Sequence, residues 1–261
     1  MVILLKVLFI DIDGTIRINK KINPKIITSL KELKNLGVKV ILSTGRNFLH
    51  ARKVARYLGT YPLLITCNGS LVKRMDNNET IKNGKIPRAT IRKVFKITSS
   101  LDCKLLAHEA NNNYYIRKND DISPDIVGMT ITSKDYDTML TLPETFKKKI
   151  PEVEVVNSSK ALYLGEKISR KIYFHDLNLK GLTKGFGVRT TFNYLGETFD
   201  EAIAIGDSNN DISMMSLVKT SVATQNATPD LKKNCNTVLT ESLELYLQKL
   251  VEELQAKGKN L

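Results

Sequence analysis

The sequence predicts an α/β protein in which a parallel-sheet core is interrupted by an inserted α+β domain. Strand and helix patterns alternate up to about residue 72, lose that order between about residues 75 and 180, and return from Gly181. Strands that alternate with helices need crossover connections, which produce a parallel sheet. Apolar residues make up 42% and charged residues 26% of the 261 residues, a composition that excludes a disordered or low-complexity chain.

The first part of this core is expected to hold three strands that alternate with two helices. The continuous apolar run at 7–10 is typical of a strand that is covered on both faces of a sheet. Asn23 is a good helix cap, Pro24 suits the first helical position, and Gly37 suits the end of that helix. A second helix is expected to end near Gly59. The strands are expected at 7–10, 38–42 and 63–65.

The middle of the chain is rich in Asn, Lys, Thr and Tyr and lacks the regular alternation of the core. We therefore assign residues 1–75 and 180–261 to the core and residues 76–179 to an inserted α+β domain. The sequence predicts two helices in this insertion, at 88–101 and 135–150. Strands are expected at 104–108, 113–117, 126–131, 154–157, 162–164 and 171–175.

The core pattern resumes after the insertion. The sequence predicts a helix at 185–195, a strand at 201–205 and a helix that begins within 212–217. Two short strands and an amphipathic closing helix complete the core. They are expected at 222–223, 238–239 and 241–254.

Two aspartates, Asp11 and Asp13, follow the first strand directly. Residues two apart in an extended chain share a face, so both carboxylates can point the same way. Acids at the end of a buried strand are costly unless they are paired, and a divalent cation is the obvious partner. Asp13 remains neutral in this scheme if it serves as an acid. The alternative is an acid-rich turn that only ends the strand.

A second group of acids, Asp207 and Asp211, follows the strand at 201–205 within the segment Gly-Asp-Ser-Asn-Asn-Asp. Oxygen ligands without paired His or Cys suit Mg²⁺ rather than zinc. Asp211 can also orient Lys184 or a metal-bound water. The same acids can cap the helix that follows, and this role is compatible with metal binding.

Hydrogen-bond donors for a phosphate follow the second strand, at Thr44, Gly45 and Arg46, and Lys184 stands where the core pattern resumes. A hydroxyl, a backbone N–H and two cations can bind a phosphate dianion. Two ionised aspartates cancel the charge of Mg²⁺, and Arg46 and Lys184 then match the charge of a phosphomonoester. Ligands of α/β sheets bind at the carboxyl ends of the strands, where these segments fall. A plain turn and a surface lysine are the alternatives.

These polar segments, in the order in which they occur along the chain, resemble the motifs of the haloacid dehalogenase-like superfamily. They are most similar to those of the Cof-type sugar-phosphate phosphatases. The resemblance covers about 1–75 and 180–261, whereas the sequence of the insertion is unfamiliar, so the family's substrates do not carry over. Thr183 stands where Ser is commoner before the lysine. The matching motifs are Asp-Ile-Asp-Gly-Thr at 11–15, Thr-Gly-Arg at 44–46, Asn-Gly at 68–69, Lys-Gly at 184–185, Gly-Asp-Ser-Asn-Asn-Asp at 206–211 and Val-Ala-Thr-Gln-Asn-Ala-Thr-Pro at 222–229.

The resemblance implies a Rossmann-like core with an inserted α+β cap, and a phosphatase that uses Mg²⁺ and an aspartyl-phosphate intermediate. Asp11 would be the nucleophile and Asp13 the general acid and base. The implied ligands of Mg²⁺ are the Asp11 side chain, the Asp13 carbonyl and Asp207. The implied phosphoryl-binding and supporting residues are Thr44, Gly45, Lys184, Asn210, Asp211 and Asn68.

The remaining features limit which partners and which cellular compartment we expect. A net charge of +13 attracts anions in general, but neither a basic tail nor an aromatic-interleaved motif indicates a nucleic-acid partner. The first ten residues read as a buried strand rather than a signal peptide, and no apolar run approaches a membrane span of about 20 residues. Three scattered cysteines exclude a disulfide framework. We expect a cytoplasmic protein that binds a small phosphorylated metabolite; nothing in the sequence indicates its oligomeric state.

Two other functions stay open at this point. A phosphomutase or phosphotransferase would pass the same phosphoryl group to a sugar, and a non-catalytic nucleic-acid-binding protein would use the net positive charge. The candidate substrate-selecting residues of the cap are His108, Tyr114, Tyr115 and Arg117, although residues of these types more often belong to a strand surface or to the cap core. We interpret His50 as a surface residue.

Overall fold

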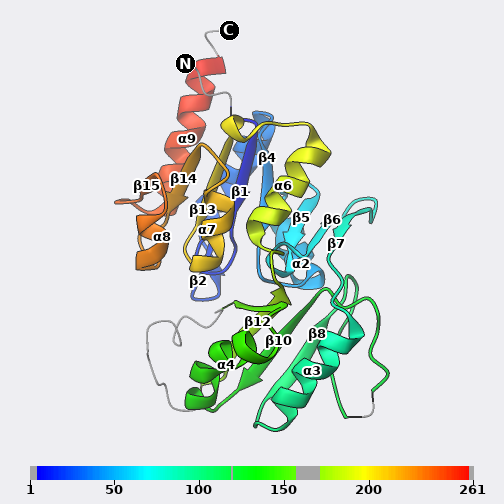
Figure 1. Cartoon of the computed structure of the whole chain (residues 1–261). Helices are drawn as coiled ribbons and strands as arrows, with labels where there is room; N and C mark the ends of the chain where they lie inside the picture. The colour runs from blue at the N-terminus through cyan, green and yellow to red at the C-terminus, as the bar shows by residue number, and fades with distance from the viewer. Residues whose placement is uncertain (1–4, 119, 157–170, 259–261) are drawn as a thin grey trace.

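The computed structural model describes residues 5–118, 120–156 and 171–258, and it confirms the predicted α/β class with a separate antiparallel sheet. In Figure 1 the core lies above the inserted cap. The central strand of the core, β1 (Val7–Ile10), pairs in parallel with β13 (Ala202–Gly206) and β4 (Lys39–Ser43). The core sheet has the order β15 (Thr237–Val238), β14 (Thr220–Ala223), β13, β1, β4, β5 (Leu63–Thr66), β6 (Leu71–Arg74) and β7 (Thr80–Asn83).

Helices cover both faces of this sheet because its buried strands are apolar on both faces. Leu8 and Ile10 of β1 belong to a core cluster with α1 (Pro24–Asn35), α2 (Phe48–Leu58) and α9 (Leu243–Gly258). Val7 and Phe9 point the other way and belong to a cluster with residues of α6 (Lys184–Leu195), α7 (Ile212–Met215) and α8 (Pro229–Lys233). The continuous apolar run therefore stabilises both layers of the core.

The ends of the first two helices follow the signals in the sequence. Asn23 caps α1, since its side chain accepts a hydrogen bond from the Lys25 N–H, and Pro24 is the first helical residue. Gly59 ends α2 with a φ of 68°, a left-handed conformation that favours glycine. A short hairpin, β2 (Arg17–Ile18) with β3 (Lys21–Ile22), connects β1 to α1. Among the described residues, no helix is both long and apolar enough to span a bilayer.

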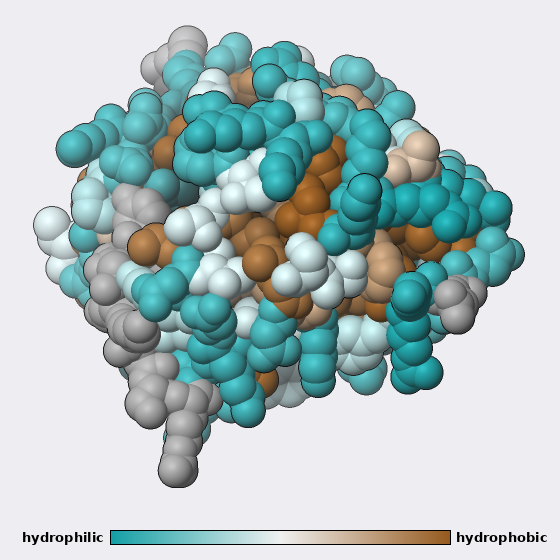
Figure 2. Space-filling model, turned by 60° about the horizontal axis from the view of Figure 1, so that its bottom comes forward, coloured by the Kyte–Doolittle hydropathy of each residue, from teal (hydrophilic) through white to brown (hydrophobic). Residues whose placement is uncertain are grey.

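In the part of the cap that the structure describes, five strands form an antiparallel sheet, and the helices α3 (Arg88–Ser99) and α4 (Tyr136–Lys149) pack on one face of it. Figure 2 brings the cap end forward and shows a mostly hydrophilic surface with apolar side chains gathered near its centre. The other face of the sheet contributes side chains to a cavity shared with the core. The strands have the order β11 (Val153–Val156), β12 (Tyr173–Leu179), β10 (Gly128–Ser133), β8 (Lys104–His108) and β9 (Asn113–Tyr115).

The structure differs from the sequence expectations mainly at element ends. The core sheet extends to β7 and so passes the boundary expected at residue 75, because β6 and β7 form an antiparallel edge that the sequence analysis did not predict. Both strands are short, and β7 is largely polar. In the cap, β12 begins at Tyr173 and continues to Leu179, beyond the expected end at 175. The strand expected at 162–164 lies outside the described residues.

Histidine burial makes the stability of the fold depend on pH. His175 is 1% exposed in the cap core, where its Nε2 bonds to the Met139 carbonyl at 2.8 Å. Burial lowers the pKa of His175 despite that hydrogen bond, and burial also lowers the pKa values of His50 and His108. Below the usual histidine pKa of about 6.5, the unfolded chain therefore binds protons more readily than the folded chain does.

We expect the free energy of unfolding to fall as the pH drops from about 6.5 toward 5, at no more than about 1.4 kcal/mol per pH unit for each histidine. In His175→Gln, which keeps an N–H donor but does not titrate, this decline should be shallower. Urea unfolding followed by circular dichroism at several pH values measures the slope. His50→Gln is the comparison: because His50 is exposed, its replacement should change the slope less than His175→Gln does. Parallel curves for wild type and His175→Gln would contradict the assignment.

Candidate active site

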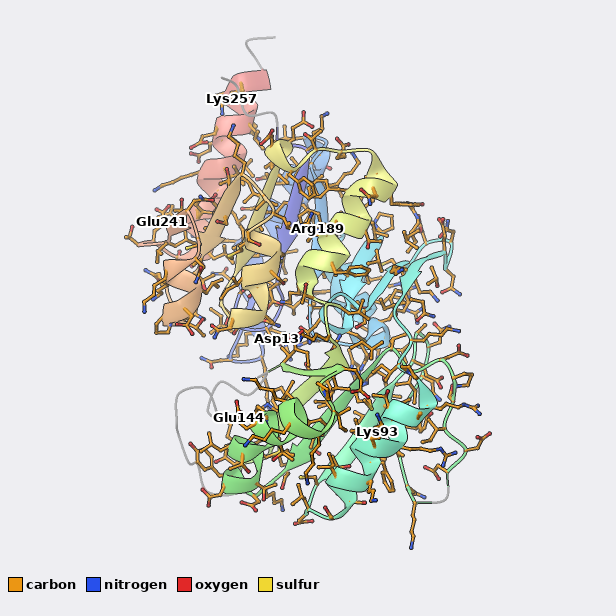
Figure 3. The ribbon with its side chains drawn as sticks, in the orientation of Figure 1. Asp13, Lys93, Glu144, Arg189, Glu241 and Lys257 are labelled. Carbon is orange, nitrogen blue, oxygen red and sulfur yellow. The ribbon has the colours of Figure 1, made fainter. Side chains whose placement is uncertain are left out.

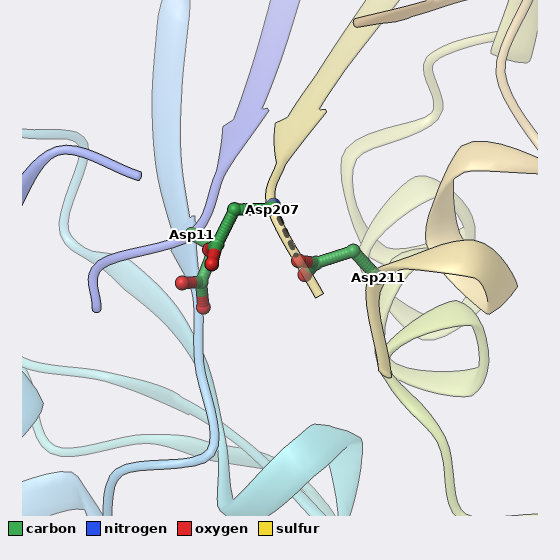
Figure 4. Close-up of side chains that lie close together, drawn as sticks. All are labelled: Asp11, Asp207 and Asp211. Atoms are coloured by element: carbon green, nitrogen blue, oxygen red, sulfur yellow. Dashed lines mark hydrogen bonds between the residues drawn. The ribbon is translucent and has the colours of Figure 1, made fainter. Parts of the chain in front are cut away.

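The site lies where three adjacent strands of the core sheet end. Asp11 follows β1, Thr44 follows β4 and Asp207 follows β13, and these strands are direct neighbours. Their carboxyl ends therefore meet at one edge of the sheet, the place where α/β sheets bind ligands. Residues that are far apart in the sequence are brought together in this way (Figure 4).

Three carboxylates gather at this edge. Oxygens of Asp11, Asp207 and Asp211 lie within 4.8 Å of one another, and all three residues are buried. The Asp207 N–H donates to Asp211 Oδ2 at 3.0 Å, as Figure 4 shows, and the Thr15 hydroxyl donates to Asp207 Oδ1 at 2.8 Å. Buried acids at this separation repel one another, so the cluster needs a cation.

Glycine is required at position 14 because the chain that leaves β1 passes close to Asp207, which follows β13. Its φ is 93°, and a Cβ at this position would lie 2.1 Å from Asp207 Oδ2. The Asn226 side chain donates to the Gly14 carbonyl at 2.9 Å and so fixes the turn from the other side. Only glycine allows the chain after Asp13 to pass this close to Asp207.

One cation, Lys184, lies among these carboxylates. Its side chain is fully buried, and its Nζ donates to Asp11 Oδ1 and to Asp211 Oδ1, each at 2.6 Å. Lys184 is the first residue of α6, which Thr183 caps by accepting a hydrogen bond from the Phe186 N–H. Burial lowers the pKa of Lys184, but the two carboxylates outweigh burial and leave the pKa above its usual value, so Lys184 is a cation.

The cluster carries more negative than positive charge. Burial raises the pKa of Asp11 well above its usual value; Lys184 opposes the rise, and the charges of Asp211 and Asp207 add to it. When ionised, the three acids carry two more charges than Lys184 balances. A divalent cation would balance this excess, and a donor set made of oxygens suits Mg²⁺.

The three acids are not equivalent as metal ligands. Asp211 is fully engaged, because Oδ1 accepts from Lys184 and Oδ2 accepts from the N–H groups of Asp207 and Ser208. Asp211 therefore holds Lys184 and the loop of η3 (Asn209–Asp211) in place. Asp207 accepts from the hydroxyls of Thr15 and Ser208, and neither donor is a cation or a backbone N–H. Asp11 and Asp207 are therefore better suited than Asp211 to hold a metal.

Asp13 differs from this cluster because it is half exposed and ion-paired. Arg46 donates to its two oxygens, through Nε at 2.5 Å and Nη2 at 2.6 Å, and Arg17 adds a longer contact of 3.4 Å. Partial burial raises the pKa of Asp13, but the hydrogen bonds and charges of Arg46 and Arg17 outweigh it and lower the pKa. Asp13 is therefore ionised here, in contrast to the neutral acid expected from the sequence. Figure 3 places it between core and cap.

The remaining predicted residues lie beside the cluster, and two of them, Gly45 and Asn68, also contact the cap. Thr44 is buried, and its hydroxyl accepts from the Arg46 N–H at 3.2 Å. Asn68 follows β5 in η1 (Cys67–Gly69) with a φ of 51°, and its Oδ1 accepts from Asn210 Nδ2 at 2.9 Å. A Cβ on Gly45 would lie 3.0 Å from Asp176 Oδ2 and 3.1 Å from the Asn68 amide. Gly45 thus permits close contact between the core and the cap.

A cavity of about 470 Å³ opens between these residues and the cap sheet. Of the cap residues singled out from the sequence, His108 lines it, and His50, although exposed, also lines it from α2. The sequence analysis missed Thr130 and Asp176. The full set of described lining residues is Asp11, Asp13, Thr44, Gly45, Arg46, Asn47, His50, Leu106, His108, Thr130, Phe174, Asp176, Ser208 and Asn210.

The other cap candidates lie elsewhere. Tyr114 packs against the cap core and accepts a hydrogen bond from the Ser123 N–H, and Tyr115 is exposed on β9. Arg117 is also exposed, next to Asp120. A period of two along β8, β10 and β12 is the signal that was available in the sequence, since it places Leu106, His108, Thr130, Phe174 and Asp176 on one face.

Known proteins with similar sequences and structures include phosphatases and hydrolases. The family described as haloacid dehalogenase-like hydrolase matches residues 8–244. A phosphoglycolate phosphatase of Nitrosopumilus maritimus is 26% identical over 85% of this chain and 84% of that protein. The 5-amino-6-(5-phospho-D-ribitylamino)uracil phosphatase of Bacillus subtilis is 25% identical over 92% of each.

Solved structures share the whole fold. A haloacid dehalogenase-like hydrolase from Bacteroides thetaiotaomicron superimposes with a TM-score of 0.80 at 18% identity, over 94% of this chain and 99% of that chain. A sugar phosphatase of subclass IIB of the same superfamily gives a TM-score of 0.75 at 20% identity, over 94% and 98%. The similarity therefore includes the cap as well as the core.

Proposed function

Because the chain belongs to the haloacid dehalogenase-like hydrolase family, we propose that it hydrolyses small phosphomonoesters, such as sugar phosphates, with Mg²⁺ and a phosphorylated Asp11. As a phosphatase of this family, it acts on phosphorylated metabolites. The observation that carries the proposal is the convergence of Asp11, Lys184 and Asp207 at one edge of the core sheet.

In the first step, an Asp11 oxygen attacks phosphorus, and the bond from phosphorus to the leaving-group oxygen breaks. Asp13, which takes up a proton from solvent once Arg46 has released it, gives that proton to the leaving oxygen, and the alcohol departs. Lys184, held by Asp211, balances negative charge on the transferring group. Arg46 can bind the phosphoryl group together with Thr44 and Gly45 once it releases Asp13, and this release removes the interaction that keeps Asp13 ionised.

In the second step, water attacks phosphorus of the aspartyl-phosphate, and Asp13, now a carboxylate, takes the proton from that water. The bond between phosphorus and Asp11 breaks, which restores the carboxylate and yields inorganic phosphate. The same carboxyl group thus serves first as acid and then as base, so the proton count balances over the cycle. A sugar hydroxyl in place of water would make the reaction a phosphoryl transfer.

The proposed metal ligands are the side chains of Asp11 and Asp207 and the backbone carbonyl of Asp13. Bound Mg²⁺ supplies positive charge that offsets the negative charge of the nucleophile and the phosphoryl group. The excess of two negative charges around Lys184 supports this assignment. Asp211 contributes by holding Lys184, because its oxygens already accept from Lys184 and from two backbone N–H groups.

Release of inorganic phosphate tests the proposed function. With Mg²⁺, the protein should release phosphate from several members of a panel of sugar phosphates, nucleotides and cofactor phosphates, and with EDTA the release should fall to background. Addition of acceptor sugars would reveal a transferase through new phosphate esters. Equal release with and without Mg²⁺ would contradict the metal requirement, and no release from any monoester would contradict the function.

A thermal shift gives a readout that does not depend on turnover. Because Mg²⁺ should neutralise the buried acids, millimolar Mg²⁺ should raise the melting temperature of the wild type. This shift should disappear in Asp207→Asn, which removes one ligand charge. Asp230→Asn, an exposed position on α8, is the control and should keep the shift.

A further inference from the structure

The cap sheet presents five side chains to the cavity above the carboxylate cluster. Strand register sets their arrangement: Thr130 of β10 lies opposite Asp176 of β12 on one side and Leu106 of β8 on the other. His108 and Phe174 lie on the same face by alternation, and all five line the cavity. A leaving group bound to a phosphoryl group at Asp11 must therefore lie against this mixed apolar and polar wall.

The polar part of this wall is a chain of hydrogen bonds that ends at the core. Asp176 accepts from the Thr130 hydroxyl at 2.8 Å and from Asn68 Nδ2 at 3.3 Å. The Thr130 hydroxyl also bonds to His108 Nε2 at 2.7 Å, and His108 Nδ1 lies 2.9 Å from Asn113 Oδ1. These two donors fix the Asp176 side chain on the cavity wall.

The described lining residues provide little for a second anion. Burial lowers the pKa values of His50 and His108, so both are neutral at neutral pH. Arg46 is the one cationic side chain among the described lining residues, and it is bonded to Asp13 and adjacent to the phosphoryl position. A carboxylate on the leaving group would therefore face the carboxylate of Asp176, and like charges at short range repel.

A hydroxyl on the leaving group would interact favourably with Asp176. A carboxylate oxygen offers lone pairs, and a hydroxyl donates to it in a charge-assisted hydrogen bond. The same wall also holds hydroxyl and imidazole groups that exchange hydrogen bonds with alcohols. Both kinds of leaving group occur in the names of the relatives: glycolate carries a carboxylate, whereas a ribityl chain carries hydroxyls.

We propose, on the basis of the function proposed above, that the cap selects phosphomonoesters whose leaving group is neutral and hydroxylated, and that Asp176 is the specificity residue that rejects carboxylate-bearing leaving groups. The wall then accepts polyol and sugar phosphates and disfavours the phosphates of hydroxy acids. This separates the chain from relatives named for phosphoglycolate, although the overall fold is the same.

Matched substrate pairs test this inference. Glycerol 3-phosphate and 3-phosphoglycerate differ by one carboxylate, as do 2-hydroxyethyl phosphate and 2-phosphoglycolate. We expect the wild type to prefer the hydroxyl member of each pair in kcat/KM by about tenfold or more, and Asp176→Asn to reduce that ratio by about tenfold. A wild type that prefers the carboxylates, or a ratio unchanged in Asp176→Asn, would overturn the proposal.

Two controls keep the outcome interpretable. Asp121→Asn removes a cap carboxylate whose side chain is 89% exposed, and it should leave the ratio at the wild-type value. If Asp176→Asn does not fold, the ratio in the wild type is measured against NaCl: screening should shrink a charge-based preference, and a salt-independent ratio overturns it. Hydrolysis of p-nitrophenyl phosphate by the wild type tests the proposed function separately, because it makes no use of this selection.

Discussion

Replacing Asp11 with asparagine should abolish turnover, with a loss of at least about 10³-fold in kcat, while the fold persists. The amide cannot form the phosphate ester that the proposed reaction passes through. It has nearly the shape of the carboxylate, and its oxygen can still accept from Lys184, which now lies 2.6 Å from Asp11 Oδ1. Phosphate release measures the loss of turnover, and circular dichroism of the same preparation shows whether the fold persists.

Asp13→Asn is the matched control for the nucleophile. With p-nitrophenyl phosphate, whose leaving group needs no acid, this variant should still phosphorylate Asp11 but should hydrolyse the ester slowly, because no base activates water. An acid quench followed by mass spectrometry should then find one phosphoryl group on Asp13→Asn and none on Asp11→Asn. Steady hydrolysis by Asp11→Asn would refute the assignment of Asp11.

The sequence predicted the fold class and the segments of the site because both depend on local patterns. The apolar runs at β1, β4 and β13 identify buried strands, and the polar residues that follow them must lie at the carboxyl edge of a parallel sheet. The structure places Asp11, Lys184 and Asp207 together at this edge. Their catalytic roles remain predictions.

Other features could not be read from the sequence because they depend on how distant surfaces meet. The ion pair between Arg46 and Asp13 requires the distance between two loops, which no local pattern contains. Alternation along β8 puts Leu106 and His108 on one face, but the packing of α3 and α4 on the opposite face decides that this face lines the cavity. Asp176 became visible as a lining residue only with that arrangement.

Lys184→Met should destabilise the protein by about 3–5 kcal/mol and remove activity. Methionine has nearly the volume of lysine, so the packing of α6 is kept, but Asp11 and Asp211 lose the cation that bonds to both at 2.6 Å. Two buried carboxylates are then left without their shared partner. Urea unfolding followed by circular dichroism measures the loss, and phosphate release measures the activity.

Lys39→Met separates this effect from the loss of an ordinary ion pair. Lys39 bonds to Glu197 at 2.7 Å, but its side chain is 27% exposed, so its removal should cost about 1 kcal/mol or less. Mg²⁺ adds positive charge beside Asp11, so it should reduce the stability difference between Lys184→Met and the wild type. It should stabilise Lys39→Met and the wild type equally and so leave their difference unchanged. A similar small loss in both variants would show that the buried acids do not depend on Lys184 for their charge balance.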